Sequence, residues 1–205
     1  MKIAIVHYWL VGMRGGEKVL EDICDIYPNA DIYTHVYNKK RISNKINNHN
    51  IYTTFINKLP FAKTFYKYYL PLMPIALKLI SLKKYDLIIS SESGPAKGVI
   101  GNNKSFHVCY CHSPMRYIWD FYDEYLSTIG LFGRIGLRIF KNYLRKWDLQ
   151  SSLNIDLIIS NSTFVSDRIN KHWKKKSVVI HPGIDLNCFS ISNMKKEYYL
   201  VLSEL

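Results

Sequence analysis

The sequence predicts a doubly wound α/β domain, with a mainly parallel sheet and helices on both of its faces. Short apolar runs rich in β-branched residues recur along the chain, and most are separated by segments whose apolar residues repeat with helical spacing. The chain has 205 residues and is 48% hydrophobic, which suffices for a sizeable core. Apolar strands that alternate with helices indicate a parallel sheet buried on both sides.

The first elements follow from local patterns. KIAIVHY predicts a strand at 2–8, and a helix is expected at 17–27 because its apolar residues fall on one helical face. DIYTHVY predicts a second strand at 31–37. A short third strand is expected at 51–55, and the polar run at 45–50 is interpreted as a loop.

The rest of the chain continues the alternation. The apolar stretch YYLPLMPIALKLISL contains Pro71 and Pro74 and therefore predicts only kinked helical pieces. Later strands are expected at 85–90, 106–111, 155–160 and 177–182. Later helices are expected at 116–126, 131–151 and 162–172.

The C-terminal residues suggest a second domain. Another strand-like run, EYYLVLSEL, begins after the polar stretch SNMKKE. We therefore expect residues 1–189 to form one domain. Residues 190–205 are interpreted as a linker and the start of a truncated C-terminal domain.

The charge favours anionic partners. The chain has 28 Lys and Arg against 16 Asp and Glu, a formal net charge of +12. Nucleic acids, phosphorylated small molecules and acidic membranes all fit this balance. Sixteen tyrosines could stack on bases. The sequence contains no nucleic-acid recognition motif, however, so no nucleic-acid partner is expected.

The cysteines and the apolar runs indicate the cellular compartment of the protein. Cys109 and Cys111 lie within the strand-like run FHVCYCH, whereas a structural zinc site needs four ligands at turn-like spacings. No metal is therefore expected, and reduced thiols are typical of a cytosolic protein. The N-terminus lacks a signal-peptide cleavage site, and no run is long enough to span a membrane. We expect a cytoplasmic protein that is soluble or peripheral on the membrane.

A pair of glycines marks the turn after the first strand. In a doubly wound fold this turn commonly holds a phosphate, because amides at a helix start offer donors and a positive dipole end. Dinucleotide binding requires G-x-G-x-x-G and an acid after the second strand, whereas this chain has Gly12-x-x-Gly15-Gly16 and then NKK at 38–40. A P-loop motif is also missing. A phosphate site and a simple tight turn both remain open.

A second cluster of reactive side chains follows the strand at 106–111, in the stretch CYCHSPMRYIWD. Its end of the strand lies at the same sheet edge as the glycine turn. The candidate site residues are His112, Ser113, Arg116, Tyr117, Trp119 and Asp120.

Structural roles for this cluster also remain open. Pro114 could open a helix with Ser113 as its N-cap. His112 could be a core histidine bonded to the backbone. Arg116 and Asp120 are four residues apart and could form an ion pair on a helix surface.

Six motifs in order along nearly the whole chain resemble those of bacterial family 4 glycosyltransferases. They are MKIAIVHYWLVGMRGGEKVLE, YLPLMPIAL, YDLIISSESGPAKGV, CYCHSPMRYIWD, IISNSTFVSDRI and VIHPGIDLNCF. Within this family the chain is similar to mannosyltransferase-like enzymes of surface-polysaccharide assembly, of the kind that build lipopolysaccharide.

The resemblance implies a GT-B enzyme, with two Rossmann-like domains and the active site between them. It implies transfer with retention from a nucleotide diphosphate sugar, with GDP-mannose as one candidate donor, and no cofactor or obligatory metal. The acceptor would be a glycan or lipid-linked. Most donor-binding residues of the family, including two glutamates with seven residues between them, belong to the C-terminal domain. No such pair occurs here, so the chain alone is expected to be inactive.

The resemblance also assigns roles to single residues. Gly15 and Gly16 match the loop that approaches the donor diphosphate, and His112 matches a histidine near the transferred sugar. His112 would position or polarise that sugar, and no residue stands out as a nucleophile. The remaining candidates would form an acceptor pocket: Tyr8, Trp9, Arg14, Ser113, Arg116, Tyr117, Trp119 and Asp120.

A basic stripe on the helix expected at 131–151 suggests contact with anionic lipid. Its members are Arg134, Arg138, Lys141 and Arg145. An apolar face accompanies it, formed by Phe140, Tyr143, Leu144 and Trp147. The alternative is that the apolar face packs on the sheet and the basic residues are solvated. For the whole chain, the alternative function is a non-catalytic partner subunit that completes its site on another chain.

Overall fold

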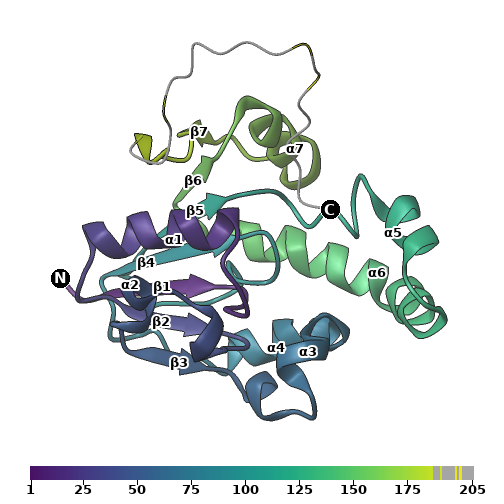
Figure 1. Ribbon diagram of the computed structural model, residues 1–205, viewed down its shortest axis with the longest axis horizontal. Helices are drawn as coiled ribbons and strands as arrows, with labels where there is room; N and C mark the ends of the chain where they lie inside the picture. The colour runs from purple at the N-terminus through teal and green to yellow at the C-terminus, as the bar shows by residue number, and fades with distance from the viewer. Residues whose placement is uncertain (187–189, 191–196, 198, 200–205) are drawn as a thin grey trace.

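The computed structural model of the chain describes residues 1–186, 190, 197 and 199 (Figure 1). Almost all of the expected linker and second-domain start at 190–205 lies outside the described residues, as does Cys188. The proposed boundary after residue 189 therefore stays a prediction.

The core of the protein is a parallel sheet. The described strands are β1 (Ile3–His7), β2 (Asp31–Thr34), β3 (Ile51–Thr53), β4 (Leu87–Glu92), β5 (Phe106–Cys111), β6 (Leu157–Ser160) and β7 (Val178–Val179). They form one seven-stranded sheet in the order β3-β2-β1-β4-β5-β6-β7, and each neighbouring pair is parallel. The order reverses between β1 and β4, where doubly wound folds bind ligands beyond the carboxyl ends of the strands. This confirms the predicted fold class.

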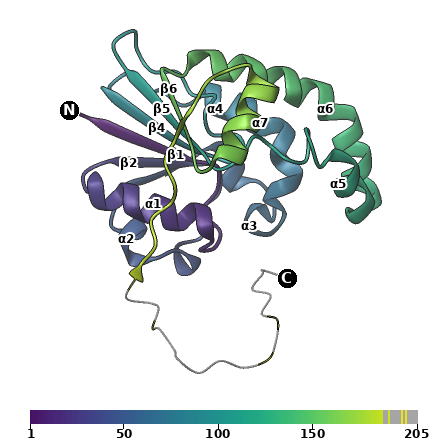
Figure 2. The ribbon, with the colours of Figure 1, turned by 90° about the horizontal axis from the view of Figure 1, so that it is seen from above.

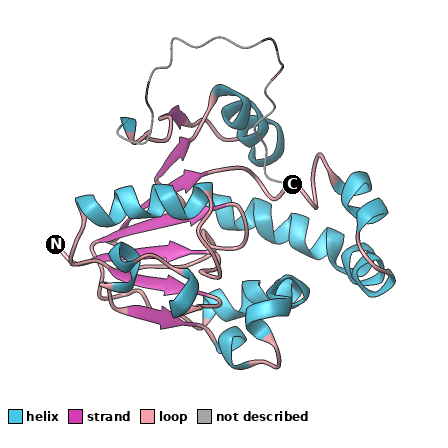
Figure 3. Cartoon of the chain, viewed as in Figure 1, coloured by secondary structure: helices cyan, strands magenta, loops and turns pink. Residues whose placement is uncertain are grey.

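Helices and tight turns connect the strands. The α-helices are α1 (Gly15–Ile26), α2 (Asn44–Asn47), α3 (Ala62–Phe65), α4 (Met73–Lys78), α5 (Tyr122–Thr128), α6 (Leu131–Ser151) and α7 (Thr163–Trp173). The 3₁₀ turns among the described residues are η1 (Lys39–Arg41), η2 (Phe55–Lys58), η3 (Tyr66–Leu72) and η4 (Ser152–Asn154). The arrows in Figure 3 show the central strands running toward the side of the molecule on which α3 and α5 lie.

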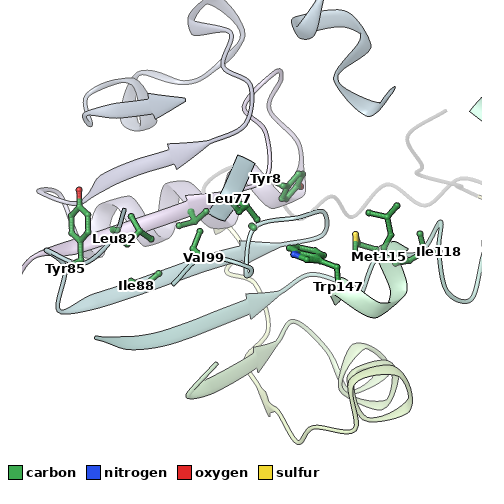
Figure 4. Packing of buried hydrophobic residues seen from close by; sticks show 13 residues of the cluster. Tyr8, Leu77, Leu82, Tyr85, Ile88, Val99, Met115, Ile118 and Trp147 are labelled. Atoms are coloured by element: carbon green, nitrogen blue, oxygen red, sulfur yellow. The ribbon is translucent and has the colours of Figure 1, made fainter. Parts of the chain in front are cut away.

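The sheet is buried on both faces because successive strand residues point to opposite sides. Ala4 and Val6 of β1 face one cluster, which includes Leu77 of α4 and Trp147 of α6 (Figure 4). Ile5 faces the opposite cluster. That cluster contains Leu20 and Cys24 of α1, and Ile42 and Ile46 around α2. Figure 2 shows α1 and α2 on one side of the sheet and α4 and α6 on the other.

A third cluster joins β5 to α7. Cys109 and Cys111 are buried free thiols that pack with Val165, Ile169 and Trp173. Cys109 is in register with Ser90 and therefore lies on the α6 face. The strand interpretation of this cysteine pair is confirmed.

Three local expectations are wrong. The segment at 45–50 is not all loop, because α2 forms where Ile46 is buried. The helix expected at 116–126 begins only at Tyr122, since Met115 and Ile118 both turn into the core and hold residues 115–121 in tight turns. The strand expected at 177–182 contains only Val178 and Val179.

Candidate functional site

The main candidate site is a pocket of about 820 Å³ at the carboxyl ends of the strands. It lies at the topological switch point, because Tyr8 and Trp9 follow β1, Ser93 follows β4, and His112 and Ser113 follow β5. The opposite wall is largely apolar and comes from η3, α5 and α6. Its residues include Leu70, Pro71, Tyr125, Phe132, Leu137 and Phe140.

The start of α1 forms the polar end of this pocket. Helix α1 begins at Gly15, two residues earlier than expected, with Arg14 as its N-cap in an extended conformation. The Glu17 carboxylate accepts a hydrogen bond from the Arg14 amide at 3.0 Å. An acidic side chain in the first turn complements the helix dipole and fixes the start of the helix.

The two glycines of this turn have different surroundings. No described glycine has a positive φ, so the need for glycine is one of space. A Cβ on Gly16 would lie 2.7 Å from the Tyr8 hydroxyl and 3.6 Å from Nε2 of His112. A Cβ on Gly15 would meet nothing within 4 Å. Gly16 is therefore required by close packing, and Gly15 is not.

Behind Gly16 lies a row of buried polar groups on three elements. The Glu17 Oε1 atom is 3.5 Å from Nε2 of His7, and the His7 Nδ1 atom is 3.0 Å from the Ser91 hydroxyl. The Ser91 hydroxyl is in turn 2.8 Å from Nε2 of His112. His112 thus stands at the pocket end of a connected series. We refer to Glu17, His7 and Ser91 as the polar chain.

Charges in this region are tuned by burial. Burial alone would raise the pKa of Glu17, but His7 and the backbone amides of Glu17 and Arg14 outweigh it, and the pKa is lowered. Burial, helped by His7, lowers the pKa of His112 from 6.5 to about 4. Burial also raises the pKa of Tyr8 to about 12, and the charge on Glu17 adds to this. Near neutral pH, Glu17 is therefore a carboxylate, whereas His112 and Tyr8 are uncharged.

Ser113 and Asp120 are held by α7 rather than by a helix of their own. The Arg168 guanidinium donates to the Ser113 hydroxyl and, at 2.7 Å, to Asp120. Lys171 and His172 also contact the Asp120 carboxylate, at 2.8 Å and 2.7 Å. Ser113 is therefore not an N-cap, and Asp120 pairs with α7 rather than with Arg116.

Sequence reasoning missed Arg168, which lines the pocket and is itself buried. A signal was present in the sequence. Arg168 lies three residues after Val165 and next to Ile169, so it sits on the apolar face of its helix. A charge at such a position indicates a buried ion pair, here with Asp120.

The pocket gathers most of the predicted residues, but not all. Gly15, Trp119 and Asp120 are not among its lining residues. Instead, the Trp119 indole donates to Asp148 at 2.7 Å and stacks on His172. The predicted residues that do line the pocket are Tyr8, Trp9, Arg14, Gly16, His112, Ser113, Arg116 and Tyr117.

A buried ion cluster lies behind the β4 end of the site. Lys97 is fully buried and donates to Glu92 at 3.1 Å and also to Asp148. The Asp148 carboxylate accepts the indole hydrogens of Trp119 and Trp173, each at 2.7 Å. Burial opposes charge on Lys97, but Asp148 and Glu92 outweigh it and raise its pKa. This cluster joins β4, α6 and α7 under the pocket.

A smaller pocket of about 360 Å³ adjoins the first and shares Trp9, Arg14 and Glu17 with it. Its lining adds two further cations, Arg41 and Lys63. The Trp9 and Tyr66 rings form part of its wall, with their centroids 4.7 Å apart. Aromatic faces and cationic groups thus meet beside the main pocket.

The basic stripe of α6 is largely engaged within the chain. Arg145 donates to the Ile118 carbonyl at 2.6 Å, and Arg134 donates to the Ile129 carbonyl at 2.9 Å. Lys141 lies over the Tyr122 ring at 3.4 Å. Arg138 is exposed. The apolar face is divided, since Leu144 and Trp147 are buried whereas Phe140 and Tyr143 are exposed.

The described part of the chain contains no cluster of three or more His, Cys, Asp or Glu side chains suited to a metal ion. None of its helices is long and apolar enough to cross a membrane.

The chain is similar to known proteins in sequence and in fold. A family model described as Glycosyltransferase Family 4 matches residues 13–187. A crystal structure of Anabaena HepE in complex with UDP matches with a TM-score of 0.56 and 17% identity, a likeness that concerns the fold. The match covers 94% of this chain and 47% of that chain, so the protein spans about half of its structural neighbour. No curated protein matches the chain by sequence.

Proposed function

Because this chain belongs to glycosyltransferase family 4 and has the Rossmann-like fold of a GT-B N-terminal domain, we propose that it is the acceptor-side half of a retaining enzyme. The enzyme transfers a hexose, with mannose as the first candidate, from a nucleotide diphosphate sugar to a growing surface polysaccharide. The observation that carries this is the pocket at the switch point, where the start of α1 and His112 face the same space.

The donor diphosphate is placed at the start of α1. Amides in the first turn of a helix have no partner within the helix, and the dipole there favours negative charge. Gly16 lines the pocket at this point. A leaving diphosphate gains negative charge as the glycosidic bond breaks, so fixed amides stabilise the transition state more than the ground state.

His112 is placed against the transferred sugar. Its ring is neutral, lies 3.6 Å from the position of a Gly16 Cβ, and lines the pocket. A neutral imidazole offers one donor and one acceptor, which suits a sugar hydroxyl. Its task is to orient the sugar, and no metal or cofactor takes part in the proposed reaction.

The acceptor is placed between Trp9 and the apolar wall from η3 and α6. This arrangement suits a glycan whose far end carries a lipid. The adjoining smaller pocket, with Arg14, Arg41 and Lys63, suits an anionic group on the same acceptor, such as a phosphate. The proposed location of the enzyme is the cytoplasmic face of the membrane.

We test this function with the enzyme that contains residues 1–205. Its turnover is measured with a panel of nucleotide sugars and an acceptor extract. His112→Ala is expected to lower kcat by about 100-fold or more, as for the loss of one positioned polar group. The matched control is His49→Ala. His49 precedes β3 at the amino ends of the strands, away from the pocket, and its ring contacts the Ala30 carbonyl.

Three outcomes contradict parts of the proposal. If His112→Ala keeps wild-type turnover, His112 has no part in the reaction. If no nucleotide sugar supports transfer, the chain is better described as a non-catalytic partner subunit. Residues 1–205 alone are expected to show no turnover, and robust turnover by them would contradict the need for a donor domain.

Membrane contact is proposed for the first half of α6. Leu131 is 68% exposed and Phe132 is 84% exposed, and the exposed cation Arg138 lies on the same helix. Exposed apolar side chains beside a basic residue suit an anionic membrane surface, where each cation contributes about 1 kcal/mol.

Vesicle co-sedimentation tests this contact with the 205-residue chain. The double substitution Leu131→Ser and Phe132→Ser is expected to reduce binding to vesicles that contain phosphatidylglycerol. The matched control is Ile26→Ser, which removes a residue 67% exposed at the far end of α1. Equal binding to neutral and anionic vesicles would refute the proposal.

A further inference from the structure

We propose that the polar chain of Glu17, His7 and Ser91 fixes the tautomer of His112. In this arrangement His112 carries its hydrogen on Nε2 and presents a bare Nδ1 that accepts a hydrogen bond from a sugar hydroxyl. The role of this polar chain in sugar transfer rests on the proposed function. The tautomer itself is a property of these residues and can be measured without a reaction.

Glu17 sets the direction of hydrogen bonding along the polar chain. This side chain is 2% exposed, and its Oε2 atom accepts the Arg14 amide at 3.0 Å. The other oxygen, Oε1, is 3.5 Å from Nε2 of His7. A carboxylate has only acceptors, and a bare ring nitrogen facing it would be repelled. The hydrogen of a neutral His7 therefore sits on Nε2.

The Ser91 hydroxyl then determines which ring nitrogen of His112 carries the hydrogen. A neutral His7 with a hydrogen on Nε2 has a bare Nδ1, which lies 3.0 Å from the Ser91 hydroxyl. Ser91 must donate its single hydrogen there, which leaves its oxygen as an acceptor. The Nε2 atom of His112, at 2.8 Å, must then be the donor. Each contact is satisfied in only one orientation when Glu17 is charged and His7 is neutral.

The remaining nitrogen of His112 is available to a ligand. Nδ1 has no hydrogen-bond partner within the part of the chain that the structure describes, and His112 lines the large pocket. With its hydrogen fixed on Nε2, the ring offers the pocket an acceptor. A sugar hydroxyl can donate to it, whereas a phosphate oxygen, which has no hydrogen, cannot. This matches a sugar near His112 and a diphosphate at the start of α1.

The opposite tautomer is the alternative that the test must separate. If His7 carried two hydrogens, its Nδ1 would donate to Ser91. The Ser91 hydroxyl would then donate to a bare Nε2 of His112, and His112 would carry its hydrogen on Nδ1. The tautomer of His112 therefore reports the direction of hydrogen bonding along the whole polar chain.

The experiment is long-range ¹H–¹⁵N NMR on the 205-residue chain with labelled histidine, with assignments from His112→Gln and His7→Gln. We expect His112 in the Nε2–H form. Ser91→Ala and Glu17→Gln are each expected to convert it to a mixture of both tautomers, and Ser91→Thr, which keeps the hydroxyl, is expected to restore the Nε2–H form. The matched control is Ser90→Ala, since Ser90 is equally buried and bonds His107 at 2.9 Å.

Wild-type His112 in the Nδ1–H form would overturn the proposal, even if every variant failed to fold. So would an unchanged tautomer in folded Ser91→Ala and Glu17→Gln. In the complete enzyme, Ser91→Ala is expected to lower kcat by about tenfold to a hundredfold with little change in donor KM, as for a partner that orients another group. If the tautomers behave as expected but kcat does not change, the positioning chain stands and the role of His112 in transfer fails.

Discussion

The adjacent glycines at the start of α1 show how differently two identical residues can be constrained. Both were expected to leave room for a phosphate. At Gly16 the nearest neighbour is the Tyr8 hydroxyl, which itself lines the pocket, whereas Gly15 faces open space. One glycine is thus needed to seat a side chain of the site, and the other is replaceable.

This contrast gives a paired prediction. Gly16→Ala is expected to destabilise the fold by about 1–3 kcal/mol, because its methyl group must displace the Tyr8 ring. Gly15→Ala is expected to stabilise it by about 0.4–1 kcal/mol, since it restricts the unfolded chain without a clash. Urea denaturation of both variants measures this. Equal effects of the two substitutions would show that the Tyr8 contact is unimportant.

The sequence could indicate single site residues only where the chain order already places them. Gly16 and His112 were found because each follows a strand end at the switch point. Trp119 and Asp120 follow the same strand, yet they turn away toward α6 and α7. Their partners, Asp148 and Arg168, are distant in sequence, so no local pattern could reveal the contacts.

At the scale of elements, one buried ion cluster joins three parts of the fold. Lys97 leads from the loop after β4 to Asp148 of α6, and Asp148 accepts a hydrogen bond from Trp173 of α7. The Lys97 ammonium also lies 4.3 Å from the centroid of the Trp173 ring. These contacts hold α7, and α6 with its part of the pocket's apolar wall, in place against the sheet.

Removal of the central cation tests this joint. Lys97→Met is expected to lower the free energy of unfolding by about 3–5 kcal/mol, because it leaves two buried carboxylates without their cation. The matched control is Lys84→Met. The Lys84 side chain is 55% exposed, and its Nζ atom lies 3.6 Å from the Asp31 carboxylate, which is longer than either Lys97 contact. The loss of such an exposed ion pair is expected to change stability by less than about 1 kcal/mol. Chemical denaturation compares them, and similar losses in both variants would contradict this assignment.

Element boundaries show what periodicity can and cannot predict. The helix at 131–151 was predicted to the residue, because its long apolar and basic repeats continue from end to end. The helix expected at 116–126 was wrong in its first half, because Met115 and Ile118 are anchored in the core at a spacing that tight turns also satisfy. Over short segments, helix and turn share the same pattern.

At the scale of the whole molecule, the fold class could be predicted because it depends on many strands and helices at once, and errors in one element do not change it. The sequence could not predict which polar side chains become buried. Four histidines with buried or partly buried rings come from β1, the loop after β2, β5 and the loop after β5. Sequence patterns do not show which histidines become buried, and this property controls how the molecule responds to acid.

Three of these histidines should make the protein sensitive to acid. Burial lowers the pKa of His35, His107 and His112 from 6.5 to about 4. Between these values the unfolded chain binds more protons than the folded one, so stability is present above pH 6.5 and is lost as the pH falls toward 4. Each fully affected histidine removes about 1.4 kcal/mol per pH unit in this window.

His35 offers the way to measure this, because its buried ring contacts two uncharged groups, the Thr54 hydroxyl and the Pro95 carbonyl, at 3.2 Å and 2.9 Å. His35→Gln is expected to reduce the slope of unfolding free energy against pH by about 1.4 kcal/mol per unit between pH 6 and 4.5. Carboxylates with lowered pKa values, such as Glu17, act mainly below this window. Urea denaturation across the range measures both slopes. An unchanged slope in the variant would show that His35 is already charged in the folded protein. It would contradict the conclusion that burial keeps His35 neutral.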